Sequence, residues 1–431
     1  MTRTAEAGLI AAACVVAAMG VAIVEFTRGN WLDAQVAVTL IVFIATFGGM
    51  QAAVRAWAPG ASALLLPTVA FLTALGFIEI YRIDGDLAAI QRWSMLVAAG
   101  VGSGVLWALR DVGVSILRRY RYVILAIGVA FLLMPLLPDG LPIRGATVNG
   151  SRLWVRIEVP GLDRIFSFQP GEIAKVLIVV FLASYLAERA DAMAAVDRTF
   201  GPFRIPEPRN LGPVLIAAAS AFLILIYQRD LGASLLLFAL FVTMLYLATG
   251  RSFYVISGAA LAVVGGVAAY AAFDHVQRRV EAWIDPFADI QGAGYQTVQG
   301  LFAMGSGSLT GSGLGLGRPD LIPAAATDFI FAAIAEEMGL AGSIAVLAGF
   351  ALLVAAGFGI AIRSKDRFRK YLAGGLSAVI ALQAFIILGG VLRLLPITGL
   401  TLPFMSYGGS SLVANVVIIA LLLRVSHEER T

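Results

Sequence analysis

The carboxylate of Asp289 lies in WIDPFADIQGAGYQTVQG (283–300), inside the longest polar stretch of the chain, residues 273–327. A positioned carboxylate can accept the proton of a hydroxyl group as that hydroxyl attacks an electrophile, which is general base catalysis. The same stretch contains Arg278, Arg279 and a glycine-dense segment, so cationic groups and adaptable backbone stand close to the acid in sequence. We therefore predict that the protein carries out its chemistry in residues 273–327.

Histidine and cysteine are nearly absent, which narrows the chemistry that remains. The 431 residues include two histidines, His275 and His427, and one cysteine, Cys14. These counts argue against a histidine-based triad, a histidine-rich metal centre and a disulfide framework. Neither a Walker motif nor a dinucleotide fingerprint followed by a strand and helix is present, so an ATP-driven pump and a redox enzyme are not predicted. Acid–base work must fall to carboxylates, lysine or tyrosine, and we expect no organic cofactor.

A second group of charges occurs in SFQPGEIAKV (167–176). Pro170 suits the first turn of a helix, where an N–H would have no intrahelical partner. Glu172 then falls in that turn, where the positive helix end favours a carboxylate, and Lys175 follows on the same face. The pair is either an interfacial anchor with a helix cap or a charged face that points into a cavity, since ionisable groups inside a span usually face an interior.

Two further acids, Glu336 and Glu337, follow Asp328 by eight and nine residues in a long apolar stretch. On a helix they would lie roughly 12–13 Å below Asp328. Carboxylates are costly at that depth unless they face a polar interior. We therefore predict an interior structural or functional site here and not exposure to lipid.

Four other polar features each allow a structural and a functional interpretation. The run GSGSLTGSGLGLG (305–317) is either a flexible loop or a segment whose backbone approaches phosphate groups. PITGLTLPFMSYGGSS (396–411) must be buried in protein or line a wet cavity if it lies at membrane depth. The turn Gln228–Asp230 is either solvated or part of a cavity rim, and Trp154 is either an interfacial tryptophan or part of the site.

Composition places the chain in a membrane. Hydrophobic residues make up 60% of the sequence, charged residues only 13%, and the mean hydropathy is +0.89. A transmembrane helix needs roughly 20 apolar residues. The first apolar stretch lacks the charge cluster and cleavage site of a signal peptide, so we expect a retained helix. The twelve predicted spans are residues 8–25, 34–54, 62–80, 93–109, 122–137, 172–187, 212–227, 230–249, 252–272, 328–361, 371–394 and 410–423.

The basic residues predict the orientation, because cytoplasmic loops are enriched in Lys and Arg. RRYR (118–121) and RSKDRFRK (363–370) are the clearest clusters. Both face inward if the N-terminus is cytoplasmic, and the C-terminus is then cytoplasmic as well. The long segments 138–171 and 273–327 consequently face outward. The pI near 9.3 reflects these anchors, and no basic stripe interleaved with aromatics suggests a nucleic-acid partner.

Seven blocks of residues about 65–425 resemble, in order, the SEDS family of RodA, FtsW and SpoVE proteins. The resemblance implies an all-α polytopic membrane fold with a ten-helix core, here residues 61–431, preceded by two added helices in residues 1–60. Longer actinobacterial members share such an addition, and IYRID (80–84) is similar to the RodA branch. The blocks are NGSRLWVRI, FSFQPGEIAK, QRDLG, DPFADIQGAGYQTVQ, MGSGSLTGSGLGLG, ATDFIFAAIAEEMG and LPITGLTLPFMSYGGSS.

The resemblance implies a peptidoglycan glycosyltransferase that polymerises lipid II on the outer face of the bacterial cytoplasmic membrane, in cell elongation, division or sporulation. It implies a class B penicillin-binding protein as partner, with other divisome or elongasome membrane proteins. The family's essential aspartate falls on Asp289, and Asp285 matches less well. We assign substrate binding to Trp154, Gln169, Glu172, Lys175, Asp230, Tyr295, Gln296, Gln299, Asp328, Glu336, Glu337, Ser406 and Ser410.

This chain departs from the family pattern at several positions. A proline that commonly follows the aspartate is Ile290 here, and the family's QPSEL reads QPGEI at 169–173. Arg229 replaces a usual proline, and Ile387 replaces a frequent asparagine. None of these changes removes a proposed catalytic group, although Ile387 alters part of the expected cavity lining.

The expected reaction needs few catalytic groups. A sugar linked through pyrophosphate already has a good leaving group, so charge stabilisation matters more than a proton donor. One carboxylate can deprotonate the incoming hydroxyl, with inversion at the anomeric carbon. Lys175, an arginine or a divalent cation such as Mg²⁺ or Mn²⁺ could hold the pyrophosphate. Two alternatives stay open, a lipid-precursor flippase with a site at the helix midplane and a non-enzymatic scaffold. Substitutions that abolish function would fall in the outer loop, the midplane or the lipid-facing surface, respectively.

Overall fold

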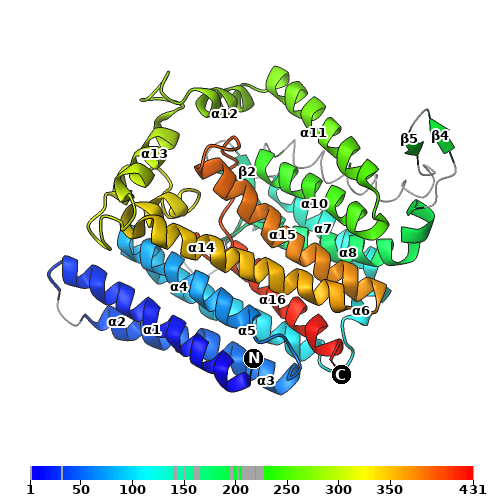
Figure 1. Cartoon of the computed structure of the whole chain (residues 1–431), viewed down its shortest axis with the longest axis horizontal. Coiled ribbons are helices and arrows are strands. Elements are labelled where there is room, and N and C mark those ends of the chain that lie inside the picture. The colour runs from blue at the N-terminus through cyan, green and yellow to red at the C-terminus, as the bar shows by residue number, and fades with distance from the viewer. Residues whose placement is uncertain are drawn as a thin grey trace. The chain divides into compact units, whose positions relative to one another are not determined.

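The protein is described here from a computed structural model (Figure 1). The structure describes residues 2–30, 33–138, 143–148, 151–158, 165–194, 198–200, 203–205, 219, 228 and 230–430. Its helices are α1 (Arg3–Thr27), α2 (Ala34–Phe43), the π-helical η1 (Ile44–Gly48), α3 (Gly49–Trp57), α4 (Leu65–Ile83), α5 (Gly85–Ala108), α6 (Ser115–Arg119), α7 (Arg121–Leu133), η2 (Met134–Leu136), α8 (Pro170–Ala194), α10 (Leu231–Thr249), α11 (Ser252–Ala272), α12 (Asp274–Ile284), α13 (Tyr295–Gly307), η3 (Pro319–Leu321), α14 (Ile330–Arg363), α15 (Arg367–Val391) and α16 (Gly409–Glu428).

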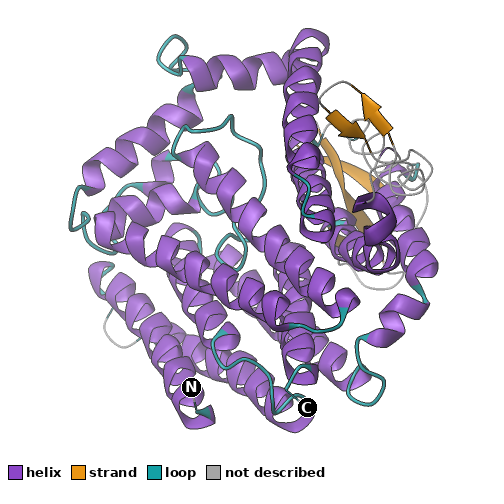
Figure 2. Ribbon diagram, turned by 45° about the vertical axis from the view of Figure 1, so that its right-hand side comes forward, coloured by secondary structure: helices purple, strands orange, loops and turns teal. Residues whose placement is uncertain are grey.

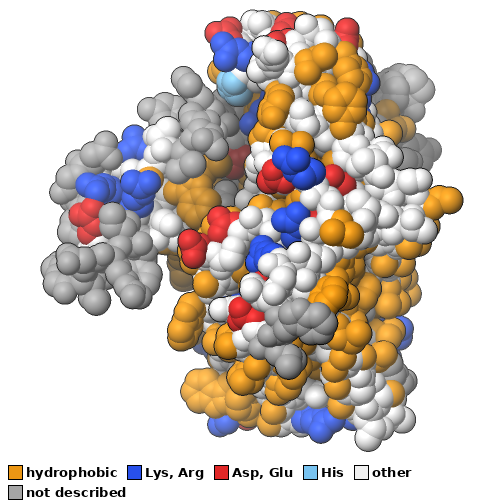
Figure 3. All heavy atoms as spheres, turned by 90° about the vertical axis from the view of Figure 1, so that its left-hand side faces the viewer, with side chains coloured by type: hydrophobic (Ala, Val, Ile, Leu, Met, Phe, Trp, Pro, Cys, Tyr) orange, Lys and Arg blue, Asp and Glu red, His pale blue; other side chains and the backbone are white. Residues whose placement is uncertain are grey.

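The helices confirm a multi-pass membrane protein. Within the described residues, nine helical segments are long and apolar enough to cross a membrane. The predicted spans 93–109 and 122–137 correspond to α5 and α7, which are helical but outside those nine. The predicted span 212–227 lies outside the described residues except for residue 219. On the face seen in Figure 3, apolar side chains dominate the lower part and charged side chains gather above them.

The chain forms two compact units. The first contains residues 1–110, 265–356 and 383–431, and the second contains residues 111–264 and 357–382. In the first unit α1 packs on α4, and α16 packs on α5; in the second, α8 packs on α7 and α10. The two units describe how residues pack together, and they do not test the predicted division into added helices and family core. That division stays a prediction.

Helix α4 forms the centre of the first unit. It is apolar on all sides, and nearly every residue from Leu65 to Tyr81 is buried, as expected for a helix surrounded by protein. Gly76 permits a close backbone approach, because a Cβ there would lie 2.3 Å from the carbonyl oxygen of Met405. The irregular segment 396–411 therefore packs directly against α4.

In the described residues the strands form two small sheets (Figure 2). The predicted outer segment 138–171 includes β1 (Ile143–Val148), β2 (Ser151–Glu158) and β3 (Ile165–Phe168), paired antiparallel in that order. A short hairpin of β4 (Arg198–Phe200) and β5 (Phe203–Ile205) lies in the predicted connector. The fold is thus helical with small sheets, and the alternation Leu153, Val155, Ile157 in β2 is the sequence signal that indicates the larger one.

Candidate functional site

Asp289 occupies a turn between helix α12 and helix α13. Its Oδ2 accepts a hydrogen bond from the N–H of Ala293 at 2.9 Å, and its carbonyl accepts one from Gly294 at 3.0 Å. A Cβ at Gly292 would lie 2.1 Å from Asp289 Oδ2, so only glycine fits beside this carboxylate. The side chain is exposed. One oxygen is thus oriented by the backbone while the carboxylate stays accessible to a substrate.

The neighbouring acid has a local role. Asp285 Oδ1 accepts the N–H of Phe287 at 3.1 Å, which is the geometry of a side chain that stabilises its own turn. Asp285 also follows directly after α12, where it continues the helical bonding through Glu281. Both acids are exposed, so the geometry alone does not decide between them as a base.

Reciprocal hydrogen bonds fix α12 in front of this turn. Trp283 Nε1 donates to the carbonyl of Arg393 at 3.1 Å, and Arg393 Nε donates to the carbonyl of Trp283 at 2.8 Å. Arg279 Nη1 donates to the carbonyl of Thr398 at 3.1 Å. Arg393 has φ +59°, a conformation usually left to glycine. The segment after α15 therefore anchors the helix that leads to Asp289.

Asp328 lies two residues before α14 and is half-buried. Burial raises its pKa to about 6, although the Thr327 hydroxyl and Arg279 act in the opposite direction. A Cβ at Gly399 would lie 3.7 Å from Asp328 Oδ2 and 3.8 Å from Arg279 Nη2, so both charged groups flank that glycine. Burial in the folded protein therefore favours the neutral form of the Asp328 carboxyl more than water would.

The middle of the segment 396–411 is buried in protein at residues 402–406, whereas residues 396–399 and 407–410 are half-buried or exposed. Ser406 Oγ donates to the carbonyl of Thr327 at 2.5 Å and accepts the N–H of Leu402 at 2.8 Å. Gln383 Nε2 donates to the carbonyl of Thr401 at 2.8 Å. Ser410 is half-buried at the start of α16. These bonds satisfy backbone that a regular helix would otherwise satisfy.

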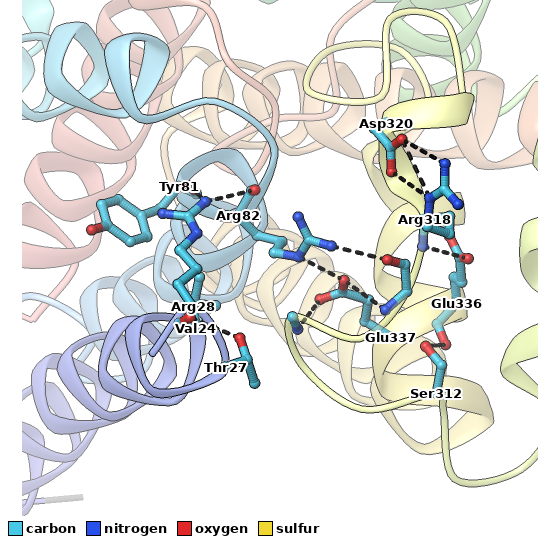
Figure 4. Close-up of polar contacts among 12 residues, drawn as sticks. Val24, Thr27, Arg28, Tyr81, Arg82, Ser312, Arg318, Asp320, Glu336 and Glu337 are labelled. Carbon is cyan, nitrogen blue, oxygen red and sulfur yellow. Dashed lines mark hydrogen bonds and ion pairs between the residues drawn. The ribbon is translucent and has the colours of Figure 1, made fainter. Parts of the chain in front are cut away.

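Glu336 and Glu337 are buried, as predicted, and bind the glycine-rich segment. Glu337 accepts the N–H groups of Gly315 at 2.8 Å and Gly317 at 3.2 Å, and Glu336 Oε1 accepts that of Arg318 at 2.9 Å (Figure 4). The glycines thus approach the protein's own carboxylates. The sequence interpretations of the segment did not include this contact, and its approach to phosphate groups stays a prediction.

The second unit contains the remaining predicted residues. Lys175 Nζ donates to Glu172 Oε2 at 2.7 Å, and both side chains are buried. Gln169 precedes α8, and its carbonyl accepts the N–H of Glu172. Asp230 is the N-cap of α10, with Oδ1 accepting the N–H of Ala233 at 2.8 Å. Trp154 is half-buried on β2. The predicted ion pair is therefore present, whereas its placement beside Asp289 stays a prediction.

Helix α13 presents the other predicted ligands. Tyr295 is exposed at its first residue, Gln296 Nε2 donates to the carbonyl of Pro323 at 3.0 Å, and Gln299 is half-buried. Sequence reasoning missed the supporting role of Arg393 and of Arg82, which pairs with Glu337 at 3.1 Å. An arginine at the end of a span, facing buried acids elsewhere in the chain, is the signal that could have indicated Arg82.

The donor set gives little support for a bound metal. Among the described residues, no three or more His, Cys, Asp or Glu side chains are grouped to hold an ion. Divalent cations such as Mg²⁺ are bound through few carboxylates together with substrate phosphates, so the predicted cation is not required to have a protein cage.

Comparison with known proteins gives a consistent result. Residues 54–431 match the family model of FtsW, RodA and SpoVE, described as a cell cycle protein. The peptidoglycan glycosyltransferase RodA of Mycobacterium tuberculosis is 39% identical over 99% of this chain and 91% of its own length. Stage V sporulation protein E of Bacillus subtilis is 32% identical over 85% and 95%, respectively. A structure reported under "Structural coordination of polymerization and crosslinking by a peptidoglycan synthase complex" matches 86% of this chain and 98% of that one, with 25% identity and a TM-score of 0.66.

Proposed function

Because this chain belongs to the SEDS family of FtsW, RodA and SpoVE proteins, we propose that it is a peptidoglycan glycosyltransferase. It polymerises lipid II into glycan strands for the cell wall. The observation that carries the proposal is the identity of 39% to a protein named as this enzyme, extending over 99% of the chain. The accessible carboxylate of Asp289 supplies a group that suits the reaction.

The proposed mechanism uses Asp289 as the general base. The hydroxyl of one sugar attacks the anomeric carbon of another, a new C–O bond forms, and the bond to the pyrophosphate oxygen breaks. Asp289 takes the hydroxyl proton, and the lipid pyrophosphate leaves with the bonding electrons. Attack from the face opposite the leaving group inverts the anomeric centre. The N–H of Ala293 keeps the carboxylate oriented while this proton moves.

Charge stabilisation of the leaving group falls to cations that the chain supplies. Lys175 is held by Glu172 in a buried pair, so it is a fixed positive group in the second unit. A divalent cation that arrives with the pyrophosphate would add to it. We propose that Trp154, Gln169 and Asp230 bind substrate in the second unit, and that the residues named above from α13, α14 and 396–411 do so in the first.

The proposed arrangement in the membrane has twelve spans, cytoplasmic termini and an outward Asp289 turn. The partner is a class B penicillin-binding protein, whose transmembrane helix contacts the lipid-facing sides of α14 and α15. Small residues would mark such a seam, but two glycines of these helices have contacts within the protein, because Gly349 faces Leu72 and Gly375 faces Met244 and Val179. The match to a peptidoglycan synthase complex supports a partner in general terms.

The deciding experiment gives the purified protein lipid II in detergent, with and without the candidate penicillin-binding protein, and measures glycan polymer by gel electrophoresis. The proposal predicts polymer that increases with enzyme and disappears with the Asp289→Asn variant. Absence of polymer from wild-type protein with its partner, at Mg²⁺ and Mn²⁺ concentrations up to the millimolar range, would contradict the function.

A further inference from the structure

The guanidinium of Arg82 joins three parts of the first unit. Arg82 stands at the end of α4, and its Nε donates to Glu337 Oε1 of α14 at 3.1 Å (Figure 4). Its Nη2 donates to the carbonyl of Gly317 at 2.9 Å. Glu337 in turn accepts the N–H groups of Gly315 and Gly317. We call Arg82, Glu337 and residues 313–317 the glycine clamp.

The clamp leaves no room for alternative packing. A Cβ at Gly311 would lie 2.2 Å from the carbonyl oxygen of Glu337, and one at Gly317 would lie 2.8 Å from its Cγ. Gly339 has φ +65° and breaks α14 just beyond Glu337. The freed carbonyls of Glu336 and Glu337 accept the N–H groups of Ser312 and Gly313 at 2.9 and 3.0 Å. The clamp is therefore a fixed structure in which the glycine-rich segment replaces a turn of helix as hydrogen-bond partner.

Arg82 is the cation of an otherwise acidic interior. Glu79, one turn earlier on α4, is fully buried and interacts electrostatically with Glu337, Arg82 and Glu336. Neither carboxyl oxygen of Glu79 has a hydrogen-bond partner among the described residues. Replacing Arg82 would leave these acids without the guanidinium that holds them together.

Helix α1 braces the clamp from its outer side. Arg28 Nη2 donates to the carbonyls of Tyr81 at 3.3 Å and Arg82 at 3.1 Å, and Glu25 Oε1 accepts the Tyr81 hydroxyl at 2.8 Å. A Cβ at Gly315 would lie 2.2 Å from Thr27 Oγ1, so α1 also contacts the clamped segment. Residues 1–53 lie before the region matched by the family model. Helix α1 thus contacts the clamp both at Arg82 of α4 and at Gly315 of the glycine-rich segment.

Helix α13 connects the clamp with the Asp289 turn. It begins six residues after Asp289 and ends in the glycine-rich segment, and its 13 residues span about 20 Å. Gly300 and Gly307 seat it on α14, since Cβ atoms there would lie 2.6 Å from the Phe329 ring and 1.9 Å from the carbonyl of Ala335. Because α13 packs as one helix, a displacement at its glycine-rich end is expected to reach the end beside Asp289.

We propose that Arg82 is a positioning residue for the reaction at Asp289, acting through Glu337, the glycine-rich segment and α13, and that α1 supports it. The proposal rests on the proposed function. Misplacement of a reacting group by about 1 Å can lower a rate about 10²-fold. We therefore expect Arg82→Gln to lower kcat for lipid II polymerisation by about 10- to 100-fold with KM changed less than twofold.

The test compares variants of the full-length protein with its partner. Arg318→Gln is the matched control, because Arg318 directly follows the same segment and, within the described part of the chain, its side chain pairs with the exposed Asp320. Arg82→Lys should recover part of kcat, since lysine keeps the positive charge but lacks the planar set of N–H donors of the guanidinium. The double variant Arg82→Gln with Glu337→Gln should be no slower than the slower single variant, because both break the same link.

Hydrogen exchange gives a readout independent of activity. Faster exchange is expected at residues 308–318 and at 285–294 in Arg82→Gln, but not in Arg318→Gln. If Arg82→Gln fails to fold, Arg28→Gln, which removes only the brace, should show the same pattern more weakly. Unchanged exchange at 285–294 and a wild-type kcat in the Arg82 or Arg28 variant would overturn the proposal while leaving the function intact. Inactive wild-type protein would overturn the function, and the exchange comparison would still test the link.

Discussion

Asp289 and Glu337 are carboxylates of the same unit with opposite surroundings. Asp289 is exposed and accepts one side-chain hydrogen bond, from Ala293. Glu337 is 1% exposed, and its two oxygens accept bonds from Arg82, Gly315 and Gly317. The protein itself occupies three of the roughly four acceptor sites of the Glu337 carboxylate, whereas Asp289 keeps most of its acceptor capacity for a proton from a substrate. The contrast separates the residue proposed to react from the one that holds the reacting segment in place.

The largest expected effect is on Asp289. The change Asp289→Asn keeps size but removes the base, so polymerisation should fall by about 10²–10⁴-fold, the usual worth of general base catalysis. The melting temperature should stay within about 2 °C of wild type because the side chain is exposed. Polymerisation and thermal unfolding of Asp289→Asn and Asp285→Asn are measured in parallel. Near-normal turnover in the first variant and a dead second variant would transfer the role to Asp285.

Glu337 should show the reverse pattern. Glu337→Gln leaves Arg82 without its charge partner, and breaking a buried pair typically costs about 3–5 kcal/mol. The loss should appear first as a lower melting temperature, with activity falling through the clamp. Glu172→Ala and Lys175→Ala should behave alike, because that pair is also buried. Full thermal stability of all three variants would mean that burial does not distinguish these acids from Asp289.

Gly292 tests whether the Asp289 turn must hold its shape. A Cβ at this position would lie 2.1 Å from Asp289 Oδ2 and 2.7 Å from its Cγ, so Gly292→Ala must displace the carboxylate. Polymerisation should fall by about tenfold or more, consistent with misplacement of a catalytic group. Gly266→Ala is the control, since no atom lies within 4 Å of its added Cβ. Equal activity of the two variants would show that the turn tolerates movement.

Asp328 is intermediate in exposure between Asp289 and Glu337. Its contribution to the stability of the protein should therefore depend on pH. Its pKa of about 6 in the folded protein exceeds the ordinary value of 3.8, so ionisation is disfavoured by folding. The stability contribution is therefore full below about pH 4 and is lost as pH rises to about 6. Relative to wild type, Asp328→Asn should gain a few degrees of melting temperature between these values. A constant difference between the two proteins from pH 4 to 7 would refute the raised pKa.

Sequence reasoning located most elements but not the partners of the polar groups. Periodicity and composition predicted α1, α4, α8 and α16 closely, because a membrane span needs a long apolar run. The depth of Glu337 followed from helical rise, and the Glu172–Lys175 pair from helical spacing. These are local properties of the chain.

The contacts that were not predicted join residues distant in sequence. Glu337 lies 255 residues from Arg82 and 22 from Gly315, and no local rule connects them. The glycines of 305–317 were interpreted by composition, whereas their positive φ angles and close approaches depend on what α14 places beside them. The sequence of β2 alternates apolar and polar residues, but it lies in a segment that the prediction of spans leaves as a loop.

The break at Gly339 has a consequence for how the long helix fits a bilayer. An unbroken helix of the 34 residues of α14 would measure about 51 Å, well beyond the roughly 30 Å of hydrocarbon. Beyond Gly339, the remaining run to Arg363 measures about 36 Å, which a modest tilt accommodates. The reversal of φ at one glycine thus divides the element into a short piece that carries the two acids and a piece of bilayer length.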